Sequence, residues 1–258
     1  MMGDQALSAL TIAGSDPSGG AGIQIDLKTF ASTGVWGMAV ITGLTAQNAC
    51  RVAGVWPVDP GIVSIQIATL LEDMTPGAVK TGMLADEAII RAVDRALPPL
   101  CRLVVDPVMV STSGHRLLAE PAVRAVRDIL IPRALLVTPN IPEAEVLAGF
   151  PITGEEGMEE AGRAILSLGA EAVVVKGGHG SGETAVDLLV TSTRVQRLVA
   201  PRLPYGVHGS GCCFSAAVTG FLALGSGLEE ACCRGKELVT RAIQGAVCGA
   251  GGVRMVNP

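Results

Sequence analysis

The sequence predicts an α/β fold of three layers, in which a mostly parallel central sheet is flanked by helices on both faces. Short apolar runs rich in β-branched residues alternate along the chain with longer segments of helical periodicity, and this alternation is typical of repeated strand–helix units. The runs are continuously apolar, as expected for strands buried on both faces. No Ser/Gly linker, charge block or internal repeat divides the chain, so we expect one domain over residues 1–258.

The expected elements follow one another along the chain. Strands are predicted for residues 7–13, 38–44, 103–106, 134–138 and 172–176. Helices are predicted for residues 61–72, 87–97, 121–130 and 155–168, and two further helices, rich in Ala and Cys, for residues 212–224 and 228–248. Residues 184–190 and 194–199 are typical of a hairpin, which we expect to be a small antiparallel addition near one edge of the sheet.

Composition and charge indicate what kind of partner the protein binds. Hydrophobic residues make up 49% of the chain and aromatic residues only 3%, so the core is expected to consist of Ala, Val, Leu and Ile. The 19 Lys and Arg residues against 24 Asp and Glu residues give a formal net charge of −5, with no basic tract. We therefore expect small-molecule ligands, with no binding to nucleic acid or membranes. No segment has the pattern of a membrane span or a secretory signal, which indicates a cytoplasmic protein.

The seven cysteines are expected to be reduced thiols. Their number is odd and no CxxC spacing occurs, which argues against both a disulfide framework and a metal site. Cys212 is distinguished by its position after a glycine-rich turn. The others that lie in the predicted helices near the end of the chain are interpreted as small buried hydrophobes: Cys213, Cys232, Cys233 and Cys248.

Two glycine-rich turns follow predicted strands. Residues 14–22 lead into a helix and match neither GxxxxGK[ST] nor GxGxxG, so they predict a close backbone approach to a ligand, or simply a tight turn. In the second turn, Gly209 and Gly211 can leave several amides pointing at one anion. Cys212 follows at the helix N-terminus, where we expect the pKa of a functional thiol to fall towards neutrality; the alternative is a buried small hydrophobe.

Polar side chains stand at the ends of three other predicted strands. Asp106 is a candidate oxygen ligand for Mg²⁺, and Lys176 is a cation beside a glycine-rich loop. Asn140 and Glu143, where a helix begins, could face one ion or phosphate, or could form a helix-capping pair. Because the carboxyl ends of parallel strands share one edge of a sheet, an anion hole, a lysine and carboxylates together predict a phosphoryl-transfer site.

These residues lie in runs that resemble the hydroxymethylpyrimidine/phosphomethylpyrimidine kinases of thiamine biosynthesis. The matching runs cover nearly the whole chain in order: TIAGSDPSGGAG at 11–22, TAQN at 45–48, VKTGML at 79–84, VDPVM at 105–109, TPN at 138–140, VKGG at 175–178 and HGSGC at 208–212. The resemblance implies a ribokinase-like fold and phosphate transfer from ATP with Mg²⁺. The implied substrates are 4-amino-5-hydroxymethyl-2-methylpyrimidine and its monophosphate, and the implied assembly is a homodimer.

The resemblance also implies which residues hold the pyrimidine. Gly14, Asp26 and Gln47 match pyrimidine contacts, and Met83 and Val108 match their apolar neighbours. An amide such as Gln47 suits the edge of an aminopyrimidine, which offers ring-nitrogen acceptors and an amine donor.

Other matched residues are implied to act on the phosphates. Asn140 and Glu143 match an NxxE element for Mg-phosphate, with Asp106 as the second metal ligand. Lys176 matches a phosphate-contacting lysine with a catalytic role. The turn of Gly209, Ser210 and Gly211 supplies a hydroxyl and amides, and Cys212 occupies the position where most ribokinase-like enzymes have an Asp base.

The sequence departs from the family pattern at two places. Gly206 and Val207 replace an Asn-Thr pair, and residues 111–114 read STSG where the family often has a lysine; one cation fewer favours the first phosphorylation over the second. A pyridoxal or pyridoxine kinase of the same lineage stays an alternative, although Gln47 and Met83 favour the pyrimidine. A non-catalytic ligand-binding member of the fold is the other alternative, and the missing GxGxxG argues against a nicotinamide oxidoreductase.

Overall fold

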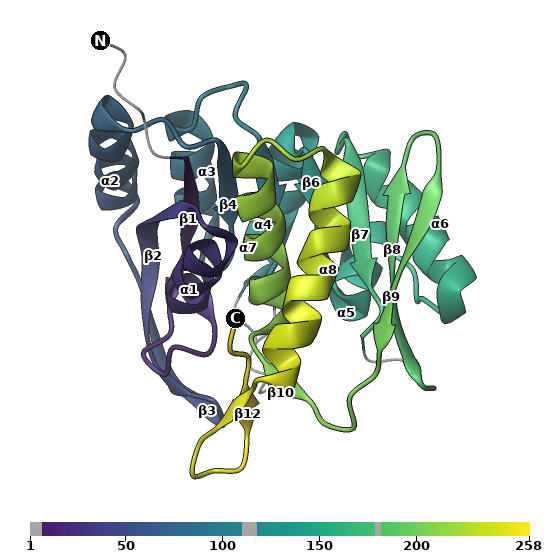
Figure 1. The fold of residues 1–258 in the computed structure, drawn as a ribbon. Helices are drawn as coiled ribbons and strands as arrows, with labels where there is room; N and C mark the ends of the chain where they lie inside the picture. Colours follow the sequence, from purple (N-terminus) through teal and green to yellow (C-terminus); the bar gives the residue numbers. More distant parts are fainter. Residues whose placement is uncertain (1–6, 110–117, 179–181) are drawn as a thin grey trace.

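The computed structural model describes residues 7–109, 118–178 and 182–258, and its centre is a nine-stranded sheet of order β3-β2-β1-β4-β5-β6-β7-β8-β9 (Figure 1). Its strands are β1 (Ser8–Ser15), β2 (Trp36–Asn48), β3 (Arg51–Pro57), β4 (Ala78–Thr81), β5 (Leu103–Val105), β6 (Leu136–Val137), β7 (Ala172–Lys176), β8 (Thr184–Thr191) and β9 (Val195–Pro201). A three-stranded sheet of order β10-β12-β11 comprises β10 (Val207–His208), β11 (Val247–Cys248) and β12 (Arg254–Met255). The helices are α1 (Gly22–Thr33), α2 (Pro60–Asp73), α3 (Glu87–Ala96), α4 (Glu120–Ala125), α5 (Ile141–Ala148), α6 (Gly154–Leu166), α7 (Ser210–Ala223) and α8 (Leu228–Gln244).

The middle of the large sheet is parallel, as the alternation of strands and helices predicts. β1 pairs in parallel with both β2 and β4, and β4, β5, β6 and β7 continue the parallel order. The hairpin β8–β9 adds antiparallel strands at one edge, which confirms the hairpin expected there. At the other edge, β3 adds an antiparallel strand that the sequence patterns do not predict.

Helices cover both faces of the sheet and give the three expected layers (Figure 1). α1, α7 and α8 lie on one face, and α2 to α6 lie on the other. On β7, Ala172 and Val174 join the core formed with α7 and α8, whereas Val173 and Val175 join the opposite core. This two-sided burial explains why the strands are continuously apolar. In the ranges that the structure describes, no helix is long and apolar enough to cross a membrane.

Local sequence determines where several helices begin and end. The Asp59 carboxylate accepts a hydrogen bond from the Gly61 amide at 2.8 Å and caps α2. Asp86 caps α3 in the same way, accepting from the Ile89 amide at 2.9 Å. α1 ends at Gly34, whose φ of 87° lies in the left-handed region that glycine adopts without strain.

Two expected helices differ from those in the structure. The helix predicted for residues 121–130 is regular only as α4 and continues as a π-helical turn over Val126–Leu130. The helix predicted for residues 228–248 ends at Gln244, because Gly245 follows as its C-cap. Cys248 is therefore exposed in β11, and its interpretation as a buried hydrophobe is wrong.

A buried ion pair joins α8 to the antiparallel edge of the sheet. Lys236 Nζ donates to Asp187 Oδ2 at 2.7 Å, and both side chains are about nine-tenths buried. Asp187 Oδ1 accepts from the Gly177 amide at 2.9 Å, so both carboxylate oxygens have protein donors. Breaking such a pair leaves an uncompensated buried charge, which is strongly destabilising.

Replacing Lys236 by Met is expected to lower the free energy of unfolding by about 3 kcal/mol, because Asp187 would stay buried without its cation. Arg163→Met is the matched control, since Arg163 pairs with Glu159 on an exposed part of α6 and its loss is expected to cost less than about 1 kcal/mol. Urea unfolding followed by circular dichroism measures both values. Equal losses would contradict the stabilising role assigned to the buried pair.

Candidate active site

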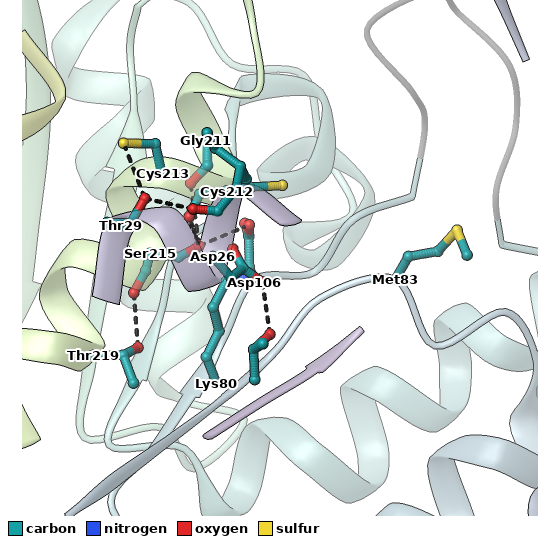
Figure 2. A network of polar contacts seen from close by, with 12 residues as sticks. Asp26, Thr29, Lys80, Met83, Asp106, Gly211, Cys212, Cys213, Ser215 and Thr219 are labelled. Carbon is teal, nitrogen blue, oxygen red and sulfur yellow. Dashed lines mark hydrogen bonds and ion pairs between the residues drawn. The ribbon is translucent and has the colours of Figure 1, made fainter. Parts of the chain in front are cut away.

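The candidate active site lies at the carboxyl ends of the central strands, beside the N-terminus of α7 (Figure 2). Asp26 comes from α1, Lys80 from β4, Asp106 from the segment after β5 and Cys212 from α7. These four groups are close enough to influence one another's charge. Lys176, at the end of β7, joins them through an ion pair with Asp106. Residues from distant segments therefore meet at the sheet edge that the sequence predicts.

Asp26 and Lys80 form a fully buried ion pair. Asp26 Oδ2 accepts from Lys80 Nζ at 2.8 Å and from Thr11 Oγ1 at 2.6 Å. Burial alone would lower the pKa of Lys80, but the charge of Asp26 raises it overall, so Lys80 stays an ammonium ion. Burial raises the pKa of Asp26, and the charge of Lys80 opposes that rise. Asp26 Oδ1 is buried and has no hydrogen-bond partner among the described residues.

Asp106 is the centre of a second polar group. Its Oδ1 accepts from Lys176 Nζ at 3.1 Å and from Thr138 Oγ1 at 3.2 Å, and its Oδ2 accepts from Ser215 Oγ at 2.9 Å. Burial raises the pKa of Asp106, but the charges of Lys176 and Lys80 together with these hydrogen bonds lower it overall. The carboxylate is therefore ionised and held against the Lys176 ammonium.

Asn140 and Glu143 form the helix-capping pair that was one of the two alternatives open from the sequence. Asn140 Oδ1 accepts from the Glu143 amide and Glu143 Oε2 accepts from the Asn140 amide, both at 2.9 Å. Burial raises the pKa of Glu143 to about 7, with Lys176 opposing and Asp106 adding to the rise. A capping carboxylate keeps further acceptor positions, so the cap is compatible with a second role toward a cation.

The turn before α7 brings its backbone close to Lys176 and to the first glycine-rich loop. Gly209 has a φ of 86°, and a Cβ atom there would overlap the carbonyl oxygen of Gly20. A Cβ atom on Gly211 would lie 3.1 Å from Lys176 Nζ, so the missing side chain makes room for the ammonium. Ser210 begins α7. A helix N-terminus beside a lysine is well suited to bind a phosphate group.

A buried hydrogen bond ties the two glycine-rich loops together. His208 Nε2 lies 3.2 Å from Asp16 Oδ2, and Asp16 also accepts from the amides of Ser18 and Ala21 at 2.8 Å each. Burial raises the pKa of Asp16, but the bonds from His208 and Ser18 lower it overall to about 2. On the other side, the His208 carbonyl accepts from the amide of Val256 at 3.1 Å, so the residue that follows β12 also supports the turn.

The low pKa expected for the Cys212 thiol is wrong. Although the residue is partly exposed, burial raises the pKa of its thiol to about 12; Lys80 opposes this rise, and Asp106 and Asp26 add to it. Desolvation and two neighbouring carboxylates thus raise the thiol pKa by more than the helix N-terminus, on which the expectation depended, can lower it. Cys212 is a neutral thiol at neutral pH. Cys213 is fully buried, as expected for a small hydrophobe.

The other residues predicted to hold the pyrimidine come from β1, β2 and the segments that follow β4 and β5. Gly14 is next to Met83, because a Cβ atom on Gly14 would overlap Met83 Cε. Gln47 lies on the part of β2 that extends beyond β1 and pairs with β3, and no hydrogen bond between described residues joins its side chain to Asp26 or Lys80. Residues 111–114, which lack the family's lysine, lie outside the described residues.

Sequence reasoning missed three polar residues of the site. Lys80 is buried in β4, and Thr138 and Ser215 orient Asp106. Each is a polar side chain within an otherwise apolar segment. That contrast is a usable signal, because a buried polar group needs a partner.

The donor set of the site fits a magnesium ion. Asp106 and Glu143 supply carboxylate oxygens, which Mg²⁺ prefers. No group of three or more His, Cys, Asp or Glu side chains suited to a metal occurs among the described residues, and Mg²⁺ at nucleotide sites usually takes only one or two carboxylates besides phosphates and water. Burial raises the pKa of Glu143 to about 7, and a cation bound beside it would favour the ionised carboxylate.

The fold and the site together define a small-molecule kinase of the ribokinase-like class, with a helix N-terminus suited to a phosphate group and a lysine at the carboxyl ends of a parallel sheet. A family model described as phosphomethylpyrimidine kinase matches residues 16–257. The chain belongs to this family.

Similar proteins carry related names. The chain is 46% identical over 241 residues to the hydroxymethylpyrimidine/phosphomethylpyrimidine kinase of Rhizobium meliloti, and the match spans 92% of this chain and 91% of that protein. It is 45% identical over 240 residues to a thiamine biosynthesis bifunctional protein of Geobacter sulfurreducens, and the match spans 92% of this chain but 49% of that protein. An ADP complex of Bacillus subtilis pyridoxal kinase has 36% identity and a TM-score of 0.88, over 97% of this chain and 96% of the other.

The low pKa of Asp16 predicts a loss of stability in acid. Because the folded-state pKa of about 2 lies below the ordinary value of 3.8, the ionised form stabilises the fold above about pH 4. This contribution, about 2 kcal/mol, is lost as the pH falls through 2. Asp16→Asn is expected to be less stable than the wild type at neutral pH and to lose less stability in acid. Parallel curves of unfolding free energy against pH for the two proteins would contradict the assignment.

Proposed function

We propose that this protein transfers phosphate from ATP to the hydroxymethyl group of 4-amino-5-hydroxymethyl-2-methylpyrimidine, and then to the monophosphate, in thiamine biosynthesis. The proposal is based mainly on one observation: a group suited to an anion and a buried hydrogen-bond acceptor both lie at the carboxyl ends of the parallel strands. Lys176 and the N-terminus of α7 suit an anion, and Asp26 offers a buried acceptor with no donor among the described residues. Family membership supports the reaction class.

The pyrimidine is proposed to bind against Asp26. Its exocyclic amine would donate to Asp26 Oδ1, which satisfies a buried acceptor that is otherwise costly to leave unpaired. Gly14 and Met83 are neighbours at the end of β1, where an apolar ring face fits. Gln47 and Val108 complete the proposed pocket, and Gln47 has both a donor and an acceptor for the ring edge.

The phosphates of ATP are proposed to bind at the start of α7. The amides from Gly209 to Gly211 and the Ser210 hydroxyl would donate to phosphate oxygens, and Lys176 would neutralise their charge. Glu143 and Asp106, near Asn140, would hold Mg²⁺, which would add positive charge beside the phosphate oxygens. Asp106 also keeps Lys176 in place through their 3.1 Å contact.

Cys212 is proposed to orient the substrate hydroxyl. Its thiol pKa of about 12 leaves little thiolate at neutral pH, which removes support from a role as a strong base. Phosphoryl transfer depends mainly on positioning and charge stabilisation, so a neutral group that holds the hydroxyl in line with the phosphate can still be catalytic.

Pyridoxal is the second candidate substrate, because the pyridoxal kinase structure superimposes over nearly the whole chain. A coupled ADP-release assay with the hydroxymethylpyrimidine, its monophosphate and pyridoxal tests the proposal. We expect kcat/KM to be highest for the hydroxymethylpyrimidine. A higher value for pyridoxal would overturn the substrate assignment, and no ADP above background with any of the three would indicate a non-catalytic ligand-binding protein.

Two Cys212 variants test the orienting role. Cys212→Ser keeps a small hydrogen-bonding group and is expected to retain kcat within about 10-fold, whereas Cys212→Ala is expected to lose about 100-fold with little change in KM for ATP. Both values come from steady-state kinetics. If the serine variant were as poor as the alanine variant, thiolate chemistry would be required and the orienting role would be wrong.

The protein is proposed to act as a homodimer in the cytoplasm. Leu44 and Trp56 are directly paired on β2 and β3, and they are 52% and 58% exposed. A second copy covering this apolar pair would remove it from water. The seven free cysteines suit a reducing compartment.

A further inference from the structure

Lys80 is a fully buried lysine to which neither composition nor motif spacing assigns a role. Its register in the sheet explains what it contacts: Lys80 on β4 is paired directly with Thr11 on β1, so their side chains leave the same face at the same level. Both donate to one oxygen of Asp26, which α1 places above that face. Gly82 has no side chain to fill the space near the ammonium, since a Cβ atom there would lie 3.2 Å from Lys80 Nζ.

The two oxygens of Asp26 are consequently unequal. Oδ2 receives both protein donors, and Oδ1 is buried with none among the described residues. The other buried lysine–aspartate pair is different, because Asp187 accepts from Lys236 with one oxygen and from the Gly177 amide with the other. A pair that only stabilises the fold can satisfy both oxygens, so the free acceptor of Asp26 points to a ligand.

We infer that Lys80 is a positioning residue that keeps Asp26 ionised with Oδ1 as a bare acceptor, and thereby makes the site select substrates that carry a hydrogen-bond donor such as an exocyclic amine. The inference rests on the proposed function. An ionised Asp26 can only accept, whereas a protonated one could donate to a ring nitrogen or carbonyl and admit other substrates. The charge of Lys80 therefore sets the direction of the hydrogen bond.

The surroundings of Asp26 leave Lys80 as its main cationic partner. The titratable groups that face Asp26 are Lys80 on β4, Cys212 and Cys213 on α7, and Asp106 after β5. The thiols are neutral at neutral pH and Asp106 is an anion. Removing the Lys80 charge would leave burial to favour the protonated form of Asp26.

The test compares two substrates that differ only in the amine: 4-amino-5-hydroxymethyl-2-methylpyrimidine and 5-hydroxymethyl-2-methylpyrimidine. The ratio of their kcat/KM values is expected to be about 10 to 100 in the wild type, the size of a charge-assisted hydrogen bond. In Lys80→Met the ratio is expected to fall near 1 at neutral pH through a higher KM for the amine, and to recover as the pH rises and Asp26 ionises. Lys80→Arg is expected to keep much of the wild-type ratio.

Lys236→Met is the matched control, because it also removes a buried lysine from an aspartate but should leave the substrate ratio unchanged. A wild-type ratio in Lys80→Met, or an equal fall in Lys236→Met, would overturn the inference. The ratio in Asp26→Asn is expected to be low and independent of pH.

A substrate-free measurement separates this inference from the proposed function and does not require a variant of Lys80 to fold. In wild-type protein labelled with ¹³C-aspartate, the Asp26 carboxyl carbon, assigned by its absence in Asp26→Asn, is expected to report an ionised group at neutral pH. A protonated Asp26 would overturn the inference. An ionised Asp26 in a protein that phosphorylates neither pyrimidine would instead refute the proposed function. Where Lys80→Met folds, the pKa of Asp26 is expected to be higher than in the wild type, because the charge of Lys80 no longer opposes the effect of burial.

Discussion

Mutual neutralisation of buried charges is the constraint on which this site depends. Lys80 with Asp26 and Lys176 with Asp106 lie at the carboxyl ends of parallel strands, where the fold leaves little solvent to compensate them. An isolated buried charge is costly, so each side chain holds its partner in one place. The ion pairing that makes the burial of these charges tolerable therefore also fixes the geometry of the site before a ligand binds.

The parallel sheet could be predicted because β1, β5 and β7 are short runs buried on both faces, which leave an unbroken apolar signal. β4 was not predicted, because Lys80 and Thr81 interrupt its apolar pattern although the strand is buried. Likewise β3 is a mostly exposed edge strand, and Gly54 interrupts its short apolar stretch. In both cases the deciding information comes from the tertiary structure, which gives Lys80 of β4 a buried partner and places β3 at the edge of the sheet.

The candidate site divides in a similar way. Residues in glycine-rich or strand-end motifs, such as Gly209, Asp106 and Lys176, could be located from their spacing, because the fold brings strand ends together. The protonation state of Cys212 could not, since it depends on Asp26 and Asp106, which approach it only in three dimensions. A helix N-terminus is visible in a sequence; the carboxylates that oppose it are not.

The bond between His208 and Asp16 also has a consequence for how the chain folds. It joins residues 192 positions apart, and Ser215 reaches Asp106 across 109. Contacts of such long range are expected to form late, because closing long loops costs entropy before any contact offsets it. A refolding chain can thus possess much of its sheet while it has no ligand site. Ligands that bind only the finished site would shift the population of chains from partly folded to complete molecules.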